Sequence, residues 1–183
     1  KVWNACRLRI GAIITDNNMC FEKSVAEYTA NLCANTLGQY IFGALAHEPI
    51  ENLQQWYVEQ RDYYRQMIYE LHAAFLAEEP EFILSKPEAS IYFVIDVRNV
   101  AKPGFDGVEF ALYCAEKGAV TLDDGNTYTL LMAPLNGFYS GAEDDNNPGK
   151  TQLRISFCEE PELLKLAPKL LSKLFRQYEA ERA

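Results

Sequence analysis

Positive charge is scarce in this sequence, which has 17 Lys and Arg residues against 26 Asp and Glu residues and a formal net charge of −9. Nucleic acids and anionic membranes are bound by clustered Lys and Arg side chains, so this balance argues against both as partners. No apolar run approaches the roughly 20 residues that a membrane-spanning helix needs. Internal repeats and low-complexity tracts are also absent from the sequence. We therefore expect a globular protein that binds neither nucleic acid nor membrane.

Patterns of metal ligands are equally sparse. The two histidines, His47 and His72, lie far from each other and from any cysteine or carboxylate pattern, which argues against a metal site or a catalytic triad. The acidic run Glu143–Asp145 lacks the alternation and the glycine of a calcium-binding loop. The cysteines are odd in number and irregularly spaced, so they indicate neither a disulfide framework nor a zinc site: Cys6, Cys20, Cys33, Cys114 and Cys158. We expect no bound metal, and reduced thiols in the cytoplasm are the simplest account of the cysteines.

The first half of the sequence has strongly helical patterns. Residues 7–15 read as a buried strand, and residues 22–46 as helix broken near Asn35-Thr36. From Pro49 onward apolar residues recur at intervals of three, four or seven until Pro80, which predicts a long helix over residues 49–79.

Strands and helices mix after Pro80. The alternation over residues 89–97 predicts a strand, and residues 107–117 read as a short helix. Residues 121–128 read as two strands joined by an Asp-Gly turn. A polar loop over residues 141–150 precedes the arginine-containing strand, and Pro161 then begins a closing amphipathic helix.

The most informative motif lies in the first eleven residues, where Lys1 is followed eight positions later by Arg9, then by an apolar residue and Gly11. This K-x7-R-x-G spacing resembles the cofactor attachment segment of the class I/II aminotransferases, which are pyridoxal-5'-phosphate-dependent enzymes of fold type I. The resemblance implies that Lys1 is the Schiff-base lysine and that Arg9 binds the cofactor phosphate. A lysine amine can serve both as nucleophile toward the cofactor and as general acid and base. The planar guanidinium fork suits a phosphate dianion.

Further motifs follow in the family's order along essentially the whole chain. Residues 87–93 resemble the small-domain strand that usually reads Pro-x-Gly-x-Phe-Tyr, and residues 132–139 resemble a loop whose commoner form begins with Pro-Gly and has Phe near its end. Residues 153–157 match the arginine strand that follows this loop. In the family that arginine binds the α-carboxylate of the substrate, so the resemblance implies this role for Arg154.

Arg154 also stands out on physical grounds. It lies inside an otherwise apolar strand, between Leu153 and Ile155, and the sequence offers no obvious local partner. Because a buried guanidinium without a partner would be costly, the position predicts either pairing within the fold or an anionic ligand. A bidentate contact to a substrate carboxylate would account for the charge.

The resemblance further implies an α/β fold, that of the fold-type-I PLP-dependent transferases. Residues 1–48 would be the C-terminal part of the large, mixed-sheet, cofactor-binding domain, residues 49–79 the inter-domain helix, and residues 80–183 the small α+β domain. The chain would then be the C-terminal part of such an enzyme, beginning at its Schiff-base lysine. Enzymes of this family generally build each active site at a subunit boundary, which implies a homodimer.

Several activities share this set of residues. We expect an aminotransferase that moves an amino group between an amino acid, such as aspartate or another common L-amino acid, and a 2-oxo acid. A decarboxylase, a carbon-sulfur lyase or a synthase of the same fold would share Lys1, Arg9 and Arg154. A non-catalytic aminotransferase-like sensor domain of a regulator is a further alternative, although the acidic composition weighs against it. The departures from the family pattern at Ala89-Ser90 and Leu135-Asn136 bear on substrate preference more than on reaction class.

Overall fold

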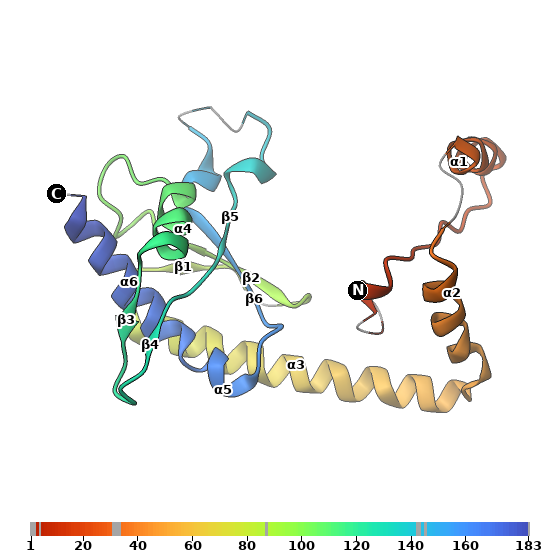
Figure 1. Ribbon diagram of the computed structural model, residues 1–183, viewed down its shortest axis with the longest axis horizontal. Helices are drawn as coiled ribbons and strands as arrows, with labels where there is room; N and C mark the ends of the chain where they lie inside the picture. The colour runs from red at the N-terminus through yellow and green to blue at the C-terminus, as the bar shows by residue number, and fades with distance from the viewer. Residues whose placement is uncertain are drawn as a thin grey trace. The chain divides into compact units, whose positions relative to one another are not determined.

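The computed structural model describes residues 3, 5–30, 34–86, 88–141, 144 and 146–182 (Figure 1). The chain divides into two compact units, Lys1–Val58 and Glu59–Ala183, and the division falls within one long helix. None of the described helices combines the length and the apolar character needed to cross a bilayer.

The regular elements in the described part of the first unit are helices and 3-10 turns. The elements are the 3-10 turn η2 (Cys6–Leu8), α1 (Asn18–Ala30), α2 (Thr36–Gly43), the 3-10 turn η3 (Ala44–His47) and the first part of α3 (Ile50–Glu78). The expected break near residue 35 is confirmed, because Asn35 caps α2 by accepting a hydrogen bond from the backbone of Gly38 at 3.1 Å.

The strand expected over residues 7–15 is wrong. Cys6–Leu8 forms a 3-10 turn, and the side chains of Ile13 and Ile14 are 74% and 96% exposed. A strand needs a neighbouring strand to satisfy its backbone N–H and C=O groups. The described part of this unit contains no other strand that could pair with these residues.

Helix α3 (Ile50–Glu78) confirms the helix expected over residues 49–79 to within one residue at each end. The carbonyl of Pro49 accepts hydrogen bonds from the backbone of Asn52 and Leu53, so Pro49 begins the hydrogen-bonding pattern. The helix ends before Pro80, since proline has no N–H and disfavours the helical conformation of the residue before it. The buried stripe of α3 belongs to the second unit and consists of Ile68, Leu71 and Phe75.

The second unit is built on a four-stranded antiparallel sheet with the strand order β1-β2-β6-β5 (Figure 1). Its strands are β1 (Ile83–Leu84), β2 (Tyr92–Asp96), β5 (Ala133–Pro134) and β6 (Gln152–Ser156). The expected strands in residues 89–97 and 153–157 are thus confirmed. Phe93 and Ile95 of β2 pair with Ile155 and Leu153 of β6, and all four side chains are buried. This face of the sheet forms part of the core, and Tyr92, Val94, Gln152 and Arg154 alternate with it on the opposite face.

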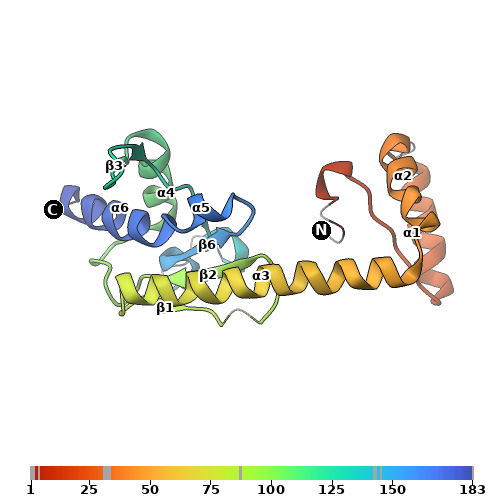
Figure 2. The ribbon, with the colours of Figure 1, turned by 90° about the horizontal axis from the view of Figure 1, so that it is seen from below.

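Helices α3, α4 (Gly107–Glu116) and α6 (Ala167–Glu181) complete the core of this unit. The ring centroids of Phe75 in α3 and Phe93 in β2 are 5.4 Å apart in an edge-to-face arrangement. Ser172 and Arg176 of α6 both donate hydrogen bonds to Glu79 at the end of α3, at 2.6 Å each. The end of α3 therefore lies beside α6, as both views show (Figures 1 and 2).

The closing helix differs from the expectation because it is interrupted. Pro161 begins a short helix, α5 (Pro161–Leu164), and α6 begins at Ala167. Pro168 lies in the first turn of α6 and has no N–H to donate to the carbonyl of Leu164, so one continuous helix would lose a hydrogen bond there. The break places Pro168 where its missing donor costs least.

The expected hairpin is confirmed as β3 (Val120–Thr121) and β4 (Thr127–Tyr128), which pair antiparallel. Gly125 in its turn has a φ of +80°, a conformation that glycine adopts without steric cost. The expected helix over residues 107–117 is confirmed as α4. The polar loop ends in the 3-10 turn η5 (Pro148–Thr151), which leads directly into β6.

Candidate functional site

The sequence singled out three residues, and the structure describes two of them. Lys1 lies outside the described residues. Arg9 belongs to the first unit and Arg154 to the second.

Arg9 directly follows the 3-10 turn η2 and adopts a left-handed conformation, with φ 52° and ψ 41°. Its backbone N–H donates to the carbonyl of Cys6 at 3.4 Å, which closes the turn. Its side chain is exposed, and it forms no ion pair with any carboxylate in the part of the chain that the structure describes. The guanidinium is thus available to an anionic ligand.

A cavity of about 780 Å³ adjoins Arg9. Its walls come from the segment around Arg9 and from α1 and α2, and they include Cys6, Ile10, Tyr28, Gln39 and Phe42. The volume is typical of sites that bind a cofactor-sized molecule. A positively charged side chain at the edge of such a cavity fits the phosphate group of pyridoxal 5'-phosphate, because a guanidinium can donate two hydrogen bonds to it.

Arg154 lies in the middle of β6, between Val94 of β2 on one side and Ala133 of β5 on the other. The residue is half-buried. Its guanidinium carbon lies 4.5 Å from the centroid of the Tyr92 ring and 5.2 Å from that of the Phe138 ring. Both distances are within the range of cation–π contacts.

The contacts of Arg154 bear on the two possibilities that the sequence left open. No carboxylate among the described residues forms an ion pair with it, and no hydrogen bond of its side chain to another described residue is found. The two aromatic rings stabilise the positive charge without accepting hydrogen bonds as a carboxylate does. The side chain is thereby held in position while its N–H donors remain available to an anion.

Phe138 is brought to Arg154 by the 3-10 turn η4 (Asn136–Phe138), and a polar network anchors this turn to the sheet. The hydroxyl of Tyr139 donates to Oε1 of Gln152 at 2.6 Å, and Nε2 of Gln152 donates to Oδ2 of Asp96 at 3.2 Å. Asp96 also accepts hydrogen bonds from Thr151 at 2.8 Å and from Nε of Arg98 at 2.8 Å.

Asp96 is the buried centre of this network and is only 4% exposed. Burial alone would raise the pKa of its carboxyl group, but the hydrogen bonds from Arg98, Thr151 and Gln152 outweigh burial and lower the pKa below its usual value. The carboxylate is therefore charged at neutral pH, and its hydrogen bonds hold the start of β6 against the end of β2.

Sequence reasoning did not identify Tyr92 and Phe138 as partners of Arg154. Tyr92 could have been found from strand pairing, because it lies two residues before Val94, which pairs with Arg154, and diagonal neighbours on one face of a sheet are in contact range. Phe138 could not, because it reaches Arg154 from a turn that follows a different strand.

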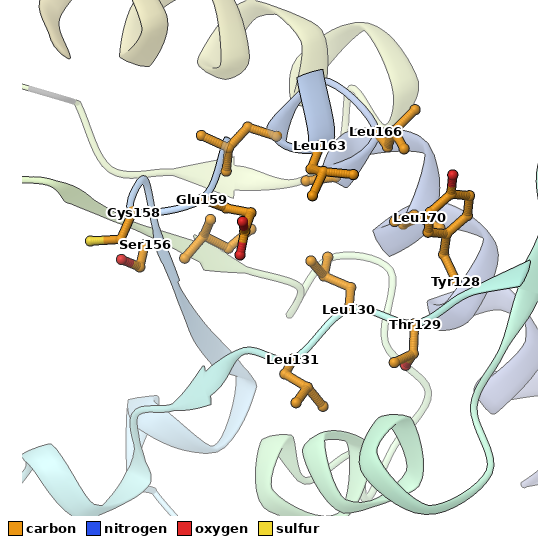
Figure 3. A pocket seen from close by; sticks show the side chains of 13 residues that line it. Tyr128, Thr129, Leu130, Leu131, Ser156, Cys158, Glu159, Leu163, Leu166 and Leu170 are labelled. Atoms are coloured by element: carbon orange, nitrogen blue, oxygen red, sulfur yellow. The ribbon is translucent and has the colours of Figure 1, made fainter. Parts of the chain in front are cut away.

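A cavity of about 420 Å³ in the second unit lies between the segment Tyr128–Leu131, the end of β6, and helices α5 and α6 (Figure 3). Leucine is the most frequent residue of its lining, and the thiol of Cys158 and the carboxylate of Glu159 lie at one side (Figure 3). Neither histidine takes part in a metal cluster, since the described residues contain no group of three or more His, Cys, Asp or Glu side chains that could hold a metal ion. The ring of His72 instead packs edge-on against Phe93, with centroids 6.3 Å apart.

The chain resembles two solved aminotransferase structures. An archaeal alanine:glyoxylate aminotransferase superposes with a TM-score of 0.63 and 22% identity, over 93% of this chain and 37% of that one. N-succinyldiaminopimelate aminotransferase from Mycobacterium tuberculosis superposes with a TM-score of 0.54 and 20% identity, over 81% of this chain and 33% of that one. The chain has the fold of the matching part of these fold-type-I aminotransferases. The expected fold class is thus confirmed.

The likeness is one of structure and not of sequence. No protein-family model matches the chain, and no curated protein matches it. The chain spans about a third of the length of each of the two solved structures, at 37% and 33%.

Proposed function

We propose that this protein is a pyridoxal-phosphate-dependent aminotransferase that moves an amino group between an amino acid and a 2-oxo acid. The observation that carries the proposal concerns Arg154, whose charged side chain lies in the middle of a sheet. Two aromatic rings contact its guanidinium, and it forms no ion pair with any described residue. A substrate carboxylate would supply the missing anion. The fold shared with two aminotransferases supports the same conclusion.

Each of the three residues has a role in this proposal. Arg9 would bind the phosphate of the cofactor at the edge of the cavity that it lines. Lys1 would hold the cofactor covalently and would move the proton at the α carbon of the substrate. Arg154 would bind the α-carboxylate and orient the amino acid. The cofactor supplies the electron sink that makes the α proton acidic.

We further propose the organisation that the family resemblance implies. Residues 1–48 would be part of a large cofactor-binding domain, residues 49–79 an inter-domain helix and residues 80–183 a small domain. This chain would be the C-terminal part of an enzyme that acts as a homodimer in the cytoplasm.

Reduction with borohydride tests this function in the full-length protein. The protein with pyridoxal phosphate should be yellow, and reduction should fix the cofactor to the peptide that contains Lys1. Lys1→Ala should abolish both the labelling and the transfer of an amino group from an amino acid to a 2-oxo acid. Lys23→Ala, which changes an exposed lysine of α1 in the same unit, should leave both unchanged. Labelling of another lysine, or normal transamination by Lys1→Ala, would contradict the proposal.

A further inference from the structure

A single side chain connects the beginning of α2 to the turn that carries Arg9. Oδ1 of Asn35 accepts a hydrogen bond from the backbone N–H of Gly38 at 3.1 Å, and Nδ2 of Asn35 donates to the carbonyl of Leu8 at 2.8 Å. The first bond caps the helix. The second reaches across 27 residues of sequence to the residue immediately before Arg9.

Close packing at Gly38 accompanies this hydrogen bond. Gly38 is buried, which holds for no other described residue of the first unit. A Cβ atom at this position would lie 2.6 Å from the carbonyl oxygen of Leu8 and 3.0 Å from Cγ2 of Ile10. Since any larger residue would collide with the backbone before Arg9, glycine is what allows the turn to lie against α2.

The turn itself is in a conformation that needs support. Arg9 has a φ of 52°, and the left-handed region costs an L-residue other than glycine about 1 kcal/mol or more. Within the turn, the backbone N–H of Leu8 donates to the carbonyl of Ala5 at 3.0 Å, and the longer hydrogen bond from Arg9 to Cys6, at 3.4 Å, closes the turn. The contact with α2 further stabilises the conformation of the turn. Residues other than glycine in such conformations are commonly associated with functional sites.

We propose that Asn35 and Gly38 are positioning residues that hold Arg9 at the cavity and thereby strengthen binding of the cofactor phosphate. The same cavity is lined by Arg9 and by Gln39, the residue that follows Gly38, so α2 fixes the turn at the wall where the phosphate would bind. A guanidinium on a fixed turn loses less conformational freedom on binding than one on a mobile turn. This inference rests on the proposed role of Arg9.

Asn35→Asp separates the two hydrogen bonds of Asn35. Aspartate caps a helix as well as asparagine does, but its carboxylate cannot donate to the carbonyl of Leu8. Gly38→Ala displaces the same carbonyl by steric collision. Asn17→Ala is the matched control, because Oδ1 of Asn17 caps α1 by accepting from Cys20 at 3.0 Å and accepts no hydrogen bond from the described residues of the turn. Circular dichroism of all variants would verify that the helices remain.

The measurement is the equilibrium affinity of the cofactor-free, full-length protein for pyridoxal phosphate and for pyridoxal, which lacks the phosphate. Asn35→Asp should weaken pyridoxal phosphate binding about fivefold, the usual net effect of one lost hydrogen bond, and should change pyridoxal binding by less than about twofold. In an Arg9→Ala background the same substitution should have almost no effect, because the group that it positions is gone. Asn17→Ala should resemble the wild type.

The outcomes distinguish this inference from the function on which it rests. If Arg9→Ala binds pyridoxal phosphate as tightly as the neighbouring control Arg7→Ala, Arg9 does not bind the phosphate and both ideas are wrong. If Arg9→Ala weakens binding but Asn35→Asp does not, only the positioning role is wrong. The positioning role is equally overturned if Asn35→Asp weakens binding by the same factor with and without Arg9, or weakens pyridoxal binding as much. Asn35→Asp decides the question even if Gly38→Ala fails to fold.

Discussion

The guanidinium carbon of Arg154 lies 4.5 Å from the centroid of the Tyr92 ring on the neighbouring strand. Tyr92 pairs with Ser156 and Arg154 pairs with Val94, so the contact runs diagonally between β2 and β6 on one face of the sheet. Among the described residues, the position of the positive charge is thus set by strand register and not by a carboxylate. It follows that Arg154 can be tested for anion binding without breaking an ion pair to any carboxylate that the structure describes.

Arg154→Ala should lower kcat/KM for amino acids, with a loss of transition-state stabilisation of about 2 to 5 kcal/mol if a desolvated carboxylate contact is lost. Amines that lack the carboxylate should lose much less, and the affinity for pyridoxal phosphate should stay nearly unchanged. The measurement compares half-reaction rates for an amino acid and its matching amine in the wild type and the variant. An equal loss for both substrates would mean that Arg154 supports the fold or the cofactor and does not bind the carboxylate.

Phe138→Leu should lower kcat/KM for amino acids by roughly two- to fivefold, because a partly exposed cation–π contact contributes about 0.5 to 1 kcal/mol. The ring is 5.2 Å from the guanidinium carbon of Arg154 and the side chain is 63% exposed, so little loss of stability should accompany the change. Phe138→Tyr keeps the ring and serves as the control. If both variants lose activity to the same extent, the ring does not act through its contact with Arg154.

Asp96→Asn should lower the free energy of unfolding by about 1 to 3 kcal/mol near neutral pH, because it replaces a buried carboxylate that accepts several hydrogen bonds. The pKa of Asp96 is lowered in the folded state, so its stabilisation is present above the pKa of the unfolded chain, about 3.9, and is lost as pH falls through the folded value. The difference between wild type and variant should therefore shrink below about pH 4.

Urea unfolding of both proteins across this pH range measures the effect. Asp62→Asn, which changes an exposed acid on α3 paired with Arg61, should alter stability little at any pH. A difference between wild type and Asp96→Asn that stays constant down to low pH would show that the network does not depend on the charge of Asp96.

Ser90→Gly should stabilise the protein by about 0.5 to 1 kcal/mol, because Ser90 has a φ of 77° and glycine relieves the strain of that conformation. The gain is limited by the greater freedom of glycine in the unfolded chain. Ala89→Gly is the control, since Ala89 does not have a positive φ and its replacement should destabilise the protein by about the same amount. Thermal unfolding of the two variants gives the comparison, and a loss of stability in both would contradict the assignment of strain to Ser90.

Cys114 should react with a thiol reagent far more slowly than the other described cysteines. Burial raises the pKa of its thiol to about 11, whereas Cys6, Cys20 and Cys158 are exposed. Because the thiolate is the reactive form, both its protonation and its burial protect Cys114. Peptide mapping after timed labelling measures the rates, with unfolded protein as the control. Labelling of Cys114 at the rate of Cys158 in the folded protein would contradict the burial of Cys114.

Local patterns in the sequence determined several elements of this protein. The recurrence of apolar residues between Pro49 and Pro80 predicted α3 because a helix brings residues three and four apart onto one face. The Asp-Gly pair predicted the β3–β4 turn for a similarly local reason. The order of motifs along the chain indicated the fold class, and it directed attention to Arg9 and Arg154.

Contacts between distant parts of the chain decided the remainder. Residues 7–15 have the composition of a strand, yet a strand forms only where another strand accepts its hydrogen bonds, and periodicity does not show whether one is present. The placement of Arg154 between Tyr92 and Phe138 depends on strand register and on a separate turn. The support of Arg9 by Asn35 depends on a hydrogen bond between residues 27 apart in sequence. The sequence determined which side chains carry charge. Only tertiary structure decided which positively charged side chains form no ion pair with a described carboxylate, because ion pairing depends on distances that the order of residues does not specify.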